Sequence, residues 1–457
     1  MSDGEGRIAT KNHEKSRREW QKDVLYVGLL ALAVVLVFWE PLTTSLALQA
    51  SDTDLVGIRR GKAVYPSTML GSWRTDILLG RPGSPSPFSL QRFLMKLFHP
   101  VGYVKLAYAL NTLALGVILY AWLRFKRIRP FCAFCGGVAL ALAGHSFTLV
   151  AAGHMGKFAM FPYVLLSLLC FDMALSGKSF VLYAAAGACM ALGLAEQPDV
   201  ALMLGMLIAA YCVFRVVAGA ILARAERRLP VQIAGMVVAA VAFFCVGAPF
   251  ILGQYRQQVA GVSQGASRTP EQKWEWATQW SFPPEDTLEL VAPTVFGIKS
   301  HDSRGPYWGR QGRSPQWGAT RQGFRNFRQE GQYMSGLVLG FAILGAVAGA
   351  RRRRRGGVPT GFGRGEVWFW IGAAAITYLL ALGKYGPLYR LFYALPRMSA
   401  MRNPVKFLYA FEICVVLLFA YGLHSFLEFV GRDGEGNGHE KSRKDAKRGR
   451  PGDVSGR

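Results

Sequence analysis

The sequence predicts an all-α polytopic membrane protein with about ten transmembrane helices, and three observations lead to this fold class. The chain of 457 residues is 51% hydrophobic, which is too apolar for ordinary soluble domains of this size. Runs such as Val24–Trp39, Val181–Ala195 and Val367–Leu382 hold no charge, and most can be extended toward the ~20 residues that a helix needs to cross hydrocarbon. The ~10-residue alternating segments of a membrane β-barrel are absent from the sequence.

Basic residues predict the orientation of the chain, because Lys and Arg concentrate in loops that stay in the cytoplasm. Here they form dense blocks on every second loop, at Arg7–Lys22, Arg124–Arg129, Arg224–Arg228, Arg351–Arg355 and Lys441–Arg450. We therefore expect a multi-pass protein of the cell (inner) membrane with both termini cytoplasmic. The net charge of +25 is explained by this topology, and we expect no nucleic acid partner.

The apolar runs divide the chain into a transmembrane domain at 24–426, a basic cytoplasmic tail at 1–23 and a basic, disordered cytoplasmic tail at 427–457. We expect the spans near Val24–Trp39, Val101–Leu123, Cys132–Val150, Phe158–Leu175, Phe180–Ala195, Val200–Leu222, Val231–Leu252, Tyr333–Ala350, Val367–Leu382 and Val405–Phe426.

The outer face then receives the long loops 40–100, 253–332 and 383–404. The first and fourth outer loops, 40–100 and 253–332, exceed what a connection requires, and loops longer than ~15 residues are usually functional or disordered. Within the first loop, Phe88–Phe98 has apolar residues at helical spacing with polar residues between them. This pattern predicts an amphipathic helix that lies flat on the membrane.

Asp52 and Asp54 are the first candidate catalytic residues, about a dozen residues beyond the first span on the outer face. Two carboxylates two positions apart can share a divalent metal such as Mg²⁺ or Mn²⁺. They can also divide the roles of general base and electrostatic stabiliser. The alternative is that both carboxylates are simply solvated in a loop turn.

Two short outer turns supply candidate substrate ligands. His154 and Lys157 lie beside glycines, which permit close backbone approach to an anionic group such as phosphate, although Lys157 could equally snorkel to lipid headgroups. Glu196, Gln197 and Asp199 fill the turn between two apolar runs. Substrate binding and helix capping by Asp199 explain this turn equally well.

The long loop 253–332 combines aromatic, amide and carboxylate groups, which suit sugar rings and their hydroxyls. Its candidate substrate ligands are Trp280, Glu285, Asp286, Tyr307 and Trp308. Anchoring of Trp side chains at the membrane interface explains the aromatic residues just as well.

The outer segment Lys384–Lys406 is basic and has no carboxylate, so it breaks the positive-inside pattern. Its candidate ligands are Lys384, Arg402, Asn403 and Lys406. Arg402 and Lys406, four residues apart at a helix start, would project toward one anion. The alternative is contact with lipid headgroups.

Several segments together resemble the bacterial YfhO-like membrane proteins, a family regarded as having the GT-C fold of polytopic glycosyltransferases. The resemblance covers roughly Val24 to Tyr421. The segments that carry it are Trp276–Gly297, Tyr307-Trp308-Gly309, the Gly-His repeat of Gly144–Lys157, the Glu196–Asp199 turn and Leu382–Tyr389.

The resemblance implies transfer of a sugar from a polyprenyl-phosphate donor to a glycan, lipid or wall polymer on the outer face. Asp52 or Asp54 would be the base, and Lys157, Arg402 and Lys406 would contact phosphate. Two alternatives stay open: a transporter or flippase of lipid-linked saccharide, and a non-catalytic assembly subunit. Transport pathways need ionisable groups deep in the spans, and only His145 and Glu412 lie deep there, which favours the enzyme.

Overall fold

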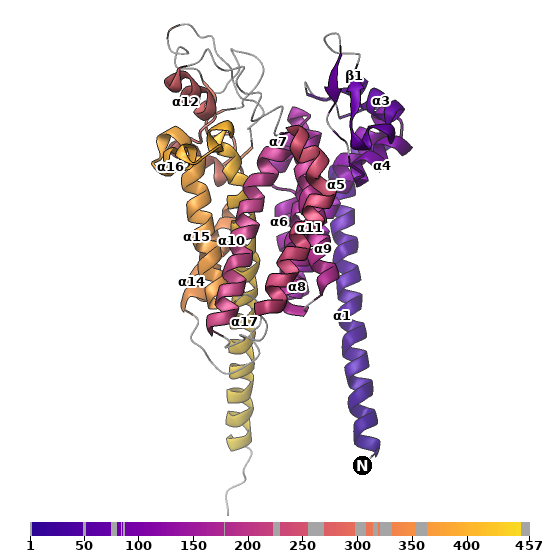
Figure 1. The fold of residues 1–457 in the computed structure, drawn as a ribbon. Coiled ribbons are helices and arrows are strands. Elements are labelled where there is room, and N and C mark those ends of the chain that lie inside the picture. The colour runs from indigo at the N-terminus through magenta and orange to yellow at the C-terminus, as the bar shows by residue number, and fades with distance from the viewer. Residues whose placement is uncertain are drawn as a thin grey trace, which may run out of the picture.

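The computed structural model describes residues 2–48, 52–74, 80–83, 85, 87–177, 179–222, 229–254, 269–297, 308–313, 319, 331–351 and 363–448. Most of these residues lie in helices that run roughly side by side in one elongated bundle (Figure 1). A polytopic helical membrane protein is therefore confirmed. Tyr307 lies outside the described residues, so its predicted role as a substrate ligand has no structural counterpart here.

Within the described residues, 7 helices are long and apolar enough to cross a membrane. They lie in α1 (Ser2–Val37), α5 (Pro100–Phe125), α6 (Pro130–Ala141) with α7 (Gly144–Ala152), α8 (Met155–Gly177), α10 (Pro198–Leu222), α11 (Leu229–Gln254) and α17 (Leu408–Arg448). The remaining predicted spans are shorter or less apolar helices, α9 (Phe180–Glu196), α14 (Gly336–Arg351) and α15 (Arg364–Ala381). Each predicted span is thus helical, and the three shorter ones stay predictions as membrane crossings.

One end of the bundle carries the extra elements, and we call it the outer end after the predicted topology (Figure 1). These elements are α2 (Trp39–Thr43), α3 (Leu55–Val64), η1 (Ser67–Leu70), β1 (Ser72–Arg74), β2 (Arg81–Gly83), α4 (Leu90–Leu97), α12 (Pro270–Thr278), η5 (Pro284–Leu290), η7 (Gly383–Tyr385), α16 (Leu388–Ala394), η8 (Met398–Ala400) and η9 (Pro404–Phe407). The two strands form an antiparallel hairpin with Trp73 opposite Pro82. The start of α1 and the far part of α17 project from the opposite, inner end (Figure 1).

Glycines allow the closest helix contacts in the bundle. A Cβ atom on Gly345 of α14 would collide with the backbone of α17 at Leu418, and one on Gly422 would collide with the carbonyl oxygen of Phe341. Small residues are favoured at such crossings because, in lipid, close packing supplies much of the association energy.

The predicted amphipathic helix is present as α4, which is shorter than Phe88–Phe98. Its N-cap, Ser89, accepts a hydrogen bond from the backbone N–H of Arg92 and donates one to Glu196 Oε1 at 2.7 Å. One face of α4, which includes Leu94 and Met95, is buried against the bundle. Phe93 is 49% exposed on the other face, as expected of a helix at the membrane interface.

The C-terminal tail differs from the sequence prediction. We expected disorder from residue 427, but α17 continues as a single helix to Arg448. The added stretch is rich in Glu, Lys and Arg, which have good helix propensity.

A buried ionic network, Lys126, Asp172, Tyr211, Arg215 and Glu366, joins four helices at the inner end. Lys126 Nζ lies 2.6 Å from both Asp172 Oδ2 and Glu366 Oε1. Arg215 forms ion pairs with the same two carboxylates. The Tyr211 hydroxyl donates to Glu366 Oε1 at 2.6 Å. Asp172 is fully buried, so these partners replace the water that its charge would otherwise require.

We expect Asp172→Asn to lower the free energy of unfolding by about 3 kcal/mol, because removal of one charge from a buried ion pair leaves the opposite charges uncompensated. The amide keeps the size of the side chain and can still accept the hydrogen bond from Trp122 Nε1, so the change tests the charge. Reversible unfolding by SDS in mixed micelles, followed by far-UV circular dichroism, measures the loss.

Glu19→Gln is the matched control. Glu19 also pairs with two cations, Lys22 and Arg124, but its side chain is 40% exposed. Exposed pairs contribute less than about 1 kcal/mol. Equal losses for Asp172→Asn and Glu19→Gln would contradict a stabilising role of the buried network.

Candidate functional site

The first outer loop and the turn that contains His154 meet at this residue. Its Nε2 atom lies 2.8 Å from Asp52 Oδ2, and its Nδ1 atom lies 3.0 Å from Lys157 Nζ. A lysine ammonium can only donate, so it donates to Nδ1, and the ring then carries its proton on Nε2 and donates to Asp52. The tautomer of His154 is thereby fixed by Lys157, and the ring orients the carboxylate of Asp52.

The glycines of the predicted Gly-His-Met-Gly-Lys motif explain how these segments approach. Gly153 ends α7 in the left-handed conformation, with φ of 78°, which glycine adopts without strain. A Cβ atom at this position would lie 2.7 Å from the backbone nitrogen of Thr53. A Cβ atom on Gly156 would lie 2.8 Å from the carbonyl oxygen of Glu196. The turn therefore fits closely between the first outer loop and the end of α9.

Asp199 and Lys406 form a second charged pair beside the first group. The Lys406 ammonium forms an ion pair with Asp199 Oδ2, and the Gln197 amide donates to Asp199 Oδ1 at 2.7 Å. Lys157 also lies within electrostatic range of Asp199. Both lysines are buried, with 8% exposure at Lys157 and 4% at Lys406. We call Asp52, His154, Lys157, Asp199 and Lys406 the outer cluster.

The charges of the outer cluster alternate along its contacts. The imidazole of His154 lies between Asp52 and Lys157. Lys157 in turn lies near Asp199, which pairs with Lys406. Two carboxylates and two ammonium groups then balance around a neutral histidine. Such a balance lets charged groups persist in a poorly hydrated site.

Asp54 and Glu196 have structural partners. Asp54 is the N-cap of α3, and its Oδ1 atom accepts the backbone N–H of Gly57 at 2.7 Å. Glu196 accepts the hydroxyl of Ser89 and so anchors α4. Asp52 and Asp54, the two predicted base candidates, therefore contact different partners. This arrangement does not fit a metal shared between them. Among the described residues, no three His, Cys, Asp or Glu side chains group as metal ligands.

Residues 269–297 pack on the basic outer segment. The backbone N–H of Phe282 donates to Ala381 O, that of Val405 donates to Trp280 O, and that of Lys384 donates to Ser281 Oγ. Trp280 and Asp286 are buried here. The side chain of Trp308 is 63% exposed and its ring packs on Phe296.

The basic segment is only partly directed toward the outer cluster. Arg402 lies over the ring of Trp276, with 4.0 Å from its guanidinium carbon to the ring centroid. Lys384 Nζ lies 3.7 Å from Glu275 Oε2. Asn403 is buried in the left-handed conformation, with φ of 66°. Arg402 and Lys406 contact different groups, and their joint binding of one anion stays a prediction.

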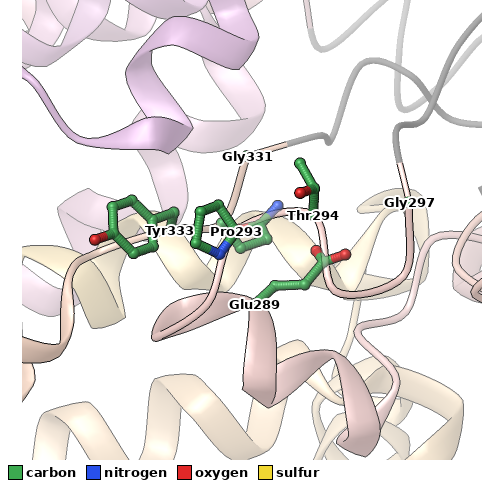
Figure 2. Close-up of a pocket in the computed structure, with 7 residues that line it drawn as sticks. Glu289, Pro293, Thr294, Gly297, Gly331 and Tyr333 are labelled. Carbon is green, nitrogen blue, oxygen red and sulfur yellow. The ribbon is translucent and has the colours of Figure 1, made fainter.

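The described part of the long loop also encloses a small pocket of about 50 Å³. Its lining residues are Glu289, Pro293, Thr294, Gly297, Gly331, Gln332 and Tyr333. Figure 2 shows the Glu289 carboxylate close beside Thr294. The pocket has room for a few water molecules and is too small for a sugar ring.

Some partners were not predictable from the sequence. Glu275 and Arg310 belong to no recognisable sequence motif. Glu275 nevertheless pairs with Lys384, and Arg310 pairs with Glu285. Thr53 lies between the two candidate aspartates, and it packs against Gly153. No local spacing signals these contacts, because they depend on how distant loops fold together.

Comparison with known proteins gives no assignment: no protein-family model, curated protein or solved structure matches the chain. The resemblance to YfhO-like proteins therefore stays a prediction from the quoted segments.

We expect pH to control the attachment of residues 308–313 to η5. Arg310 donates to both oxygens of Glu285, and these hydrogen bonds lower the pKa of the Glu285 carboxyl. A lowered pKa means that the ion pair stabilises the contact above the usual range of glutamate. This stability is lost as the pH falls through the lowered value.

Hydrogen–deuterium exchange of peptides that cover 308–313 measures this effect. Exchange, corrected for its intrinsic pH dependence, should accelerate in the wild type as the pH falls below the usual range of glutamate. Glu285→Gln should already exchange fast at neutral pH and show no further step. A wild-type protein without the acid step would contradict the role of this pair.

Proposed function

We propose that the protein is a membrane glycosyltransferase of GT-C type that uses a polyprenyl-phosphate-linked sugar. The observation that supports it best is the convergence of Asp52, His154 and Lys157 with Asp199 and Lys406 at the outer helix ends. A base at the outer ends of the helices suits a donor whose lipid tail stays in the bilayer while its sugar reaches water. The acceptor is a glycan, a lipid or a wall polymer.

Asp52 is the base in this proposal. It takes the proton of an acceptor hydroxyl as the acceptor oxygen forms a bond to the anomeric carbon of the sugar. The bond between that carbon and the phosphate oxygen breaks, and its electron pair leaves with the polyprenyl phosphate. His154 acts as a positioning residue, because its Nε2–H group holds one oxygen of Asp52 and so orients the carboxylate.

The leaving phosphate requires cations, and the contacts favour arginines of the basic segment over Lys157 and Lys406. The two lysines already balance Asp52 and Asp199 within the outer cluster. Arg402 lies over the ring of Trp276, and a guanidinium in this position keeps its N–H groups in its own plane, where they can donate to phosphate oxygens. Neighbouring indole rings also suit the apolar face of a sugar.

A transporter or flippase of lipid-linked saccharide is the second candidate. The buried pair of His145 and Glu412 favours it, because ionisable groups deep inside spans often line transport pathways. Transport would move lipid-linked saccharide across vesicles without breaking the bond between sugar and phosphate, which separates the two functions experimentally.

We expect Asp52→Asn to lower sugar transfer by about 100-fold or more, because loss of a positioned general base typically costs this much. The assay uses membranes and decaprenyl-phosphate-linked glucose, mannose and galactose as donors. Transfer is measured as labelled sugar in glycan, lipid and wall fractions.

Asp54→Asn is the matched control. Asparagine caps a helix as well as aspartate does, so α3 should persist and transfer should stay within a few fold of the wild type. Full activity in both variants would contradict a base in this turn. An unchanged glycan profile after deletion of the gene, with no transfer from the three donors, would contradict the glycosyltransferase proposal.

A further inference from the structure

Helices α3 and α4 form one unit at the outer end, and two lysines hold them together (Figure 1). Lys62, in the last turn of α3, donates from Nζ to the carbonyl oxygen of Phe98 at 2.8 Å. Lys96, in the last turn of α4, donates to the carbonyl oxygen of Lys62 at 3.1 Å. Each ammonium thus bonds a carbonyl at the end of the other helix, where the helix itself supplies no partner. A Cβ atom on Gly61 would lie 3.2 Å from the sulfur of Met95, so the two helices also pack closely.

Contacts with the bundle fix which face of α4 is outward. Gln91 is buried, and its Nε2 atom donates to Asn111 Oδ1 on α5 at 2.9 Å. Phe93 and Leu97, on the other face of α4, are exposed. The outward face of α4 is therefore apolar and held in a defined orientation.

The exposed face of α3 combines apolar side chains with arginines. Val56, Arg60 and Val64 follow at intervals of four residues, so they lie on one face of the helix. All three are exposed, and so is Arg59, which precedes Arg60. The guanidinium groups and the valine side chains therefore share one surface.

This unit carries a concentrated positive charge. Helices α3 and α4 hold five Lys and Arg residues and no carboxylate. Arg92 lies within electrostatic range of Glu196, which offsets one of the five charges. Lys62 and Lys96 are bonded to neutral carbonyl oxygens, which do not cancel their charges. The outer end thus presents cations beside exposed apolar side chains.

We propose that α3 and α4 bind the anionic phospholipid surface of the outer leaflet. The exposed Val, Phe and Leu side chains enter the boundary between headgroups and acyl chains, and Arg59 and Lys96 contact headgroup phosphates. Charge complementarity requires an anionic lipid, because a zwitterionic headgroup has no net charge to attract the cations. A soluble polyanion would match the cations but would leave the exposed apolar side chains in water, so a lipid surface fits better.

Lipid binding at this unit sets the level of the first outer loop. The unit lies between the spans in α1 and α5, so the chain enters and leaves it at the membrane. Asp54 is the N-cap of α3, and Asp52 lies two residues earlier. Attachment of α3 to headgroups therefore holds Asp52 at the level where it meets His154.

Photo-crosslinking in nanodiscs tests this surface in the full-length protein. Photoactivatable analogues of phosphatidylglycerol and phosphatidylcholine are placed in separate phosphatidylcholine discs, and the crosslinked peptides are identified by mass spectrometry. We expect peptides that cover 55–64 and 88–99 to crosslink more to the phosphatidylglycerol analogue. Arg59→Gln should lower this excess by about fivefold, as expected for one basic residue near an anionic surface. Glutamine has good helix propensity, so α3 should persist.

Lys273→Gln is the matched control, because Lys273 is also exposed at the outer end but lies on α12. It should leave the excess at 55–64 and 88–99 unchanged. Phe93→Ser removes an apolar side chain and should lower crosslinking of 88–99 to both analogues.

Equal crosslinking of the two analogues to the wild type, or an excess unchanged in Arg59→Gln, would overturn the proposal. Unchanged crosslinking in Phe93→Ser would overturn it as well and would indicate a soluble polyanion as the ligand of these cations. The readout requires no sugar transfer, so its result stands whether or not the glycosyltransferase proposal holds.

Discussion

The pairing of Asp172 and Glu366 with Lys126 and Arg215 is the constraint on which the rest of the structure depends. Four charges lie almost out of water at the inner end, and each is tolerable only while its partners stay in place. The network therefore fixes how α8, α10 and α15 are rotated and how far each is shifted along its axis.

The same helices carry the outer cluster at their other ends. Lys157 and Asp172 are both on α8, separated by about 22 Å at a rise of 1.5 Å per residue. Asp199 and Arg215 are likewise both on α10. A helix fixed in rotation by its inner charge presents its outer charge in a defined direction. The outer pairs then depend on close approaches at Gly153 and Gly156, where any larger residue would separate the segments.

Sequence patterns predicted the helices and their arrangement well, but they predicted the contacts of individual charged side chains poorly. Hydrophobic runs predicted the helices, the spacing at Phe88–Phe98 predicted α4, and the charge pattern predicted that Asp52, Lys157 and Asp199 share one end. The N-cap role of Asp54 and the pairing of Lys406 with Asp199 were not predicted. A carboxylate before a helix and a carboxylate in a site look alike in sequence, and only tertiary packing decides between them.

The position of the buried charges relates the outer cluster to the interior. Lys406, Tyr409 and Glu412 connect a balanced ion pair at the outer end with an imidazole stacked deeper in the bundle. Electrostatic interactions are stronger at a given distance where water is excluded, so Lys406 and Asp199 depend on each other as partners at the outer end. A purely structural bundle gains nothing from an incompletely bonded acid at this depth, because an apolar residue would pack there without a desolvation cost.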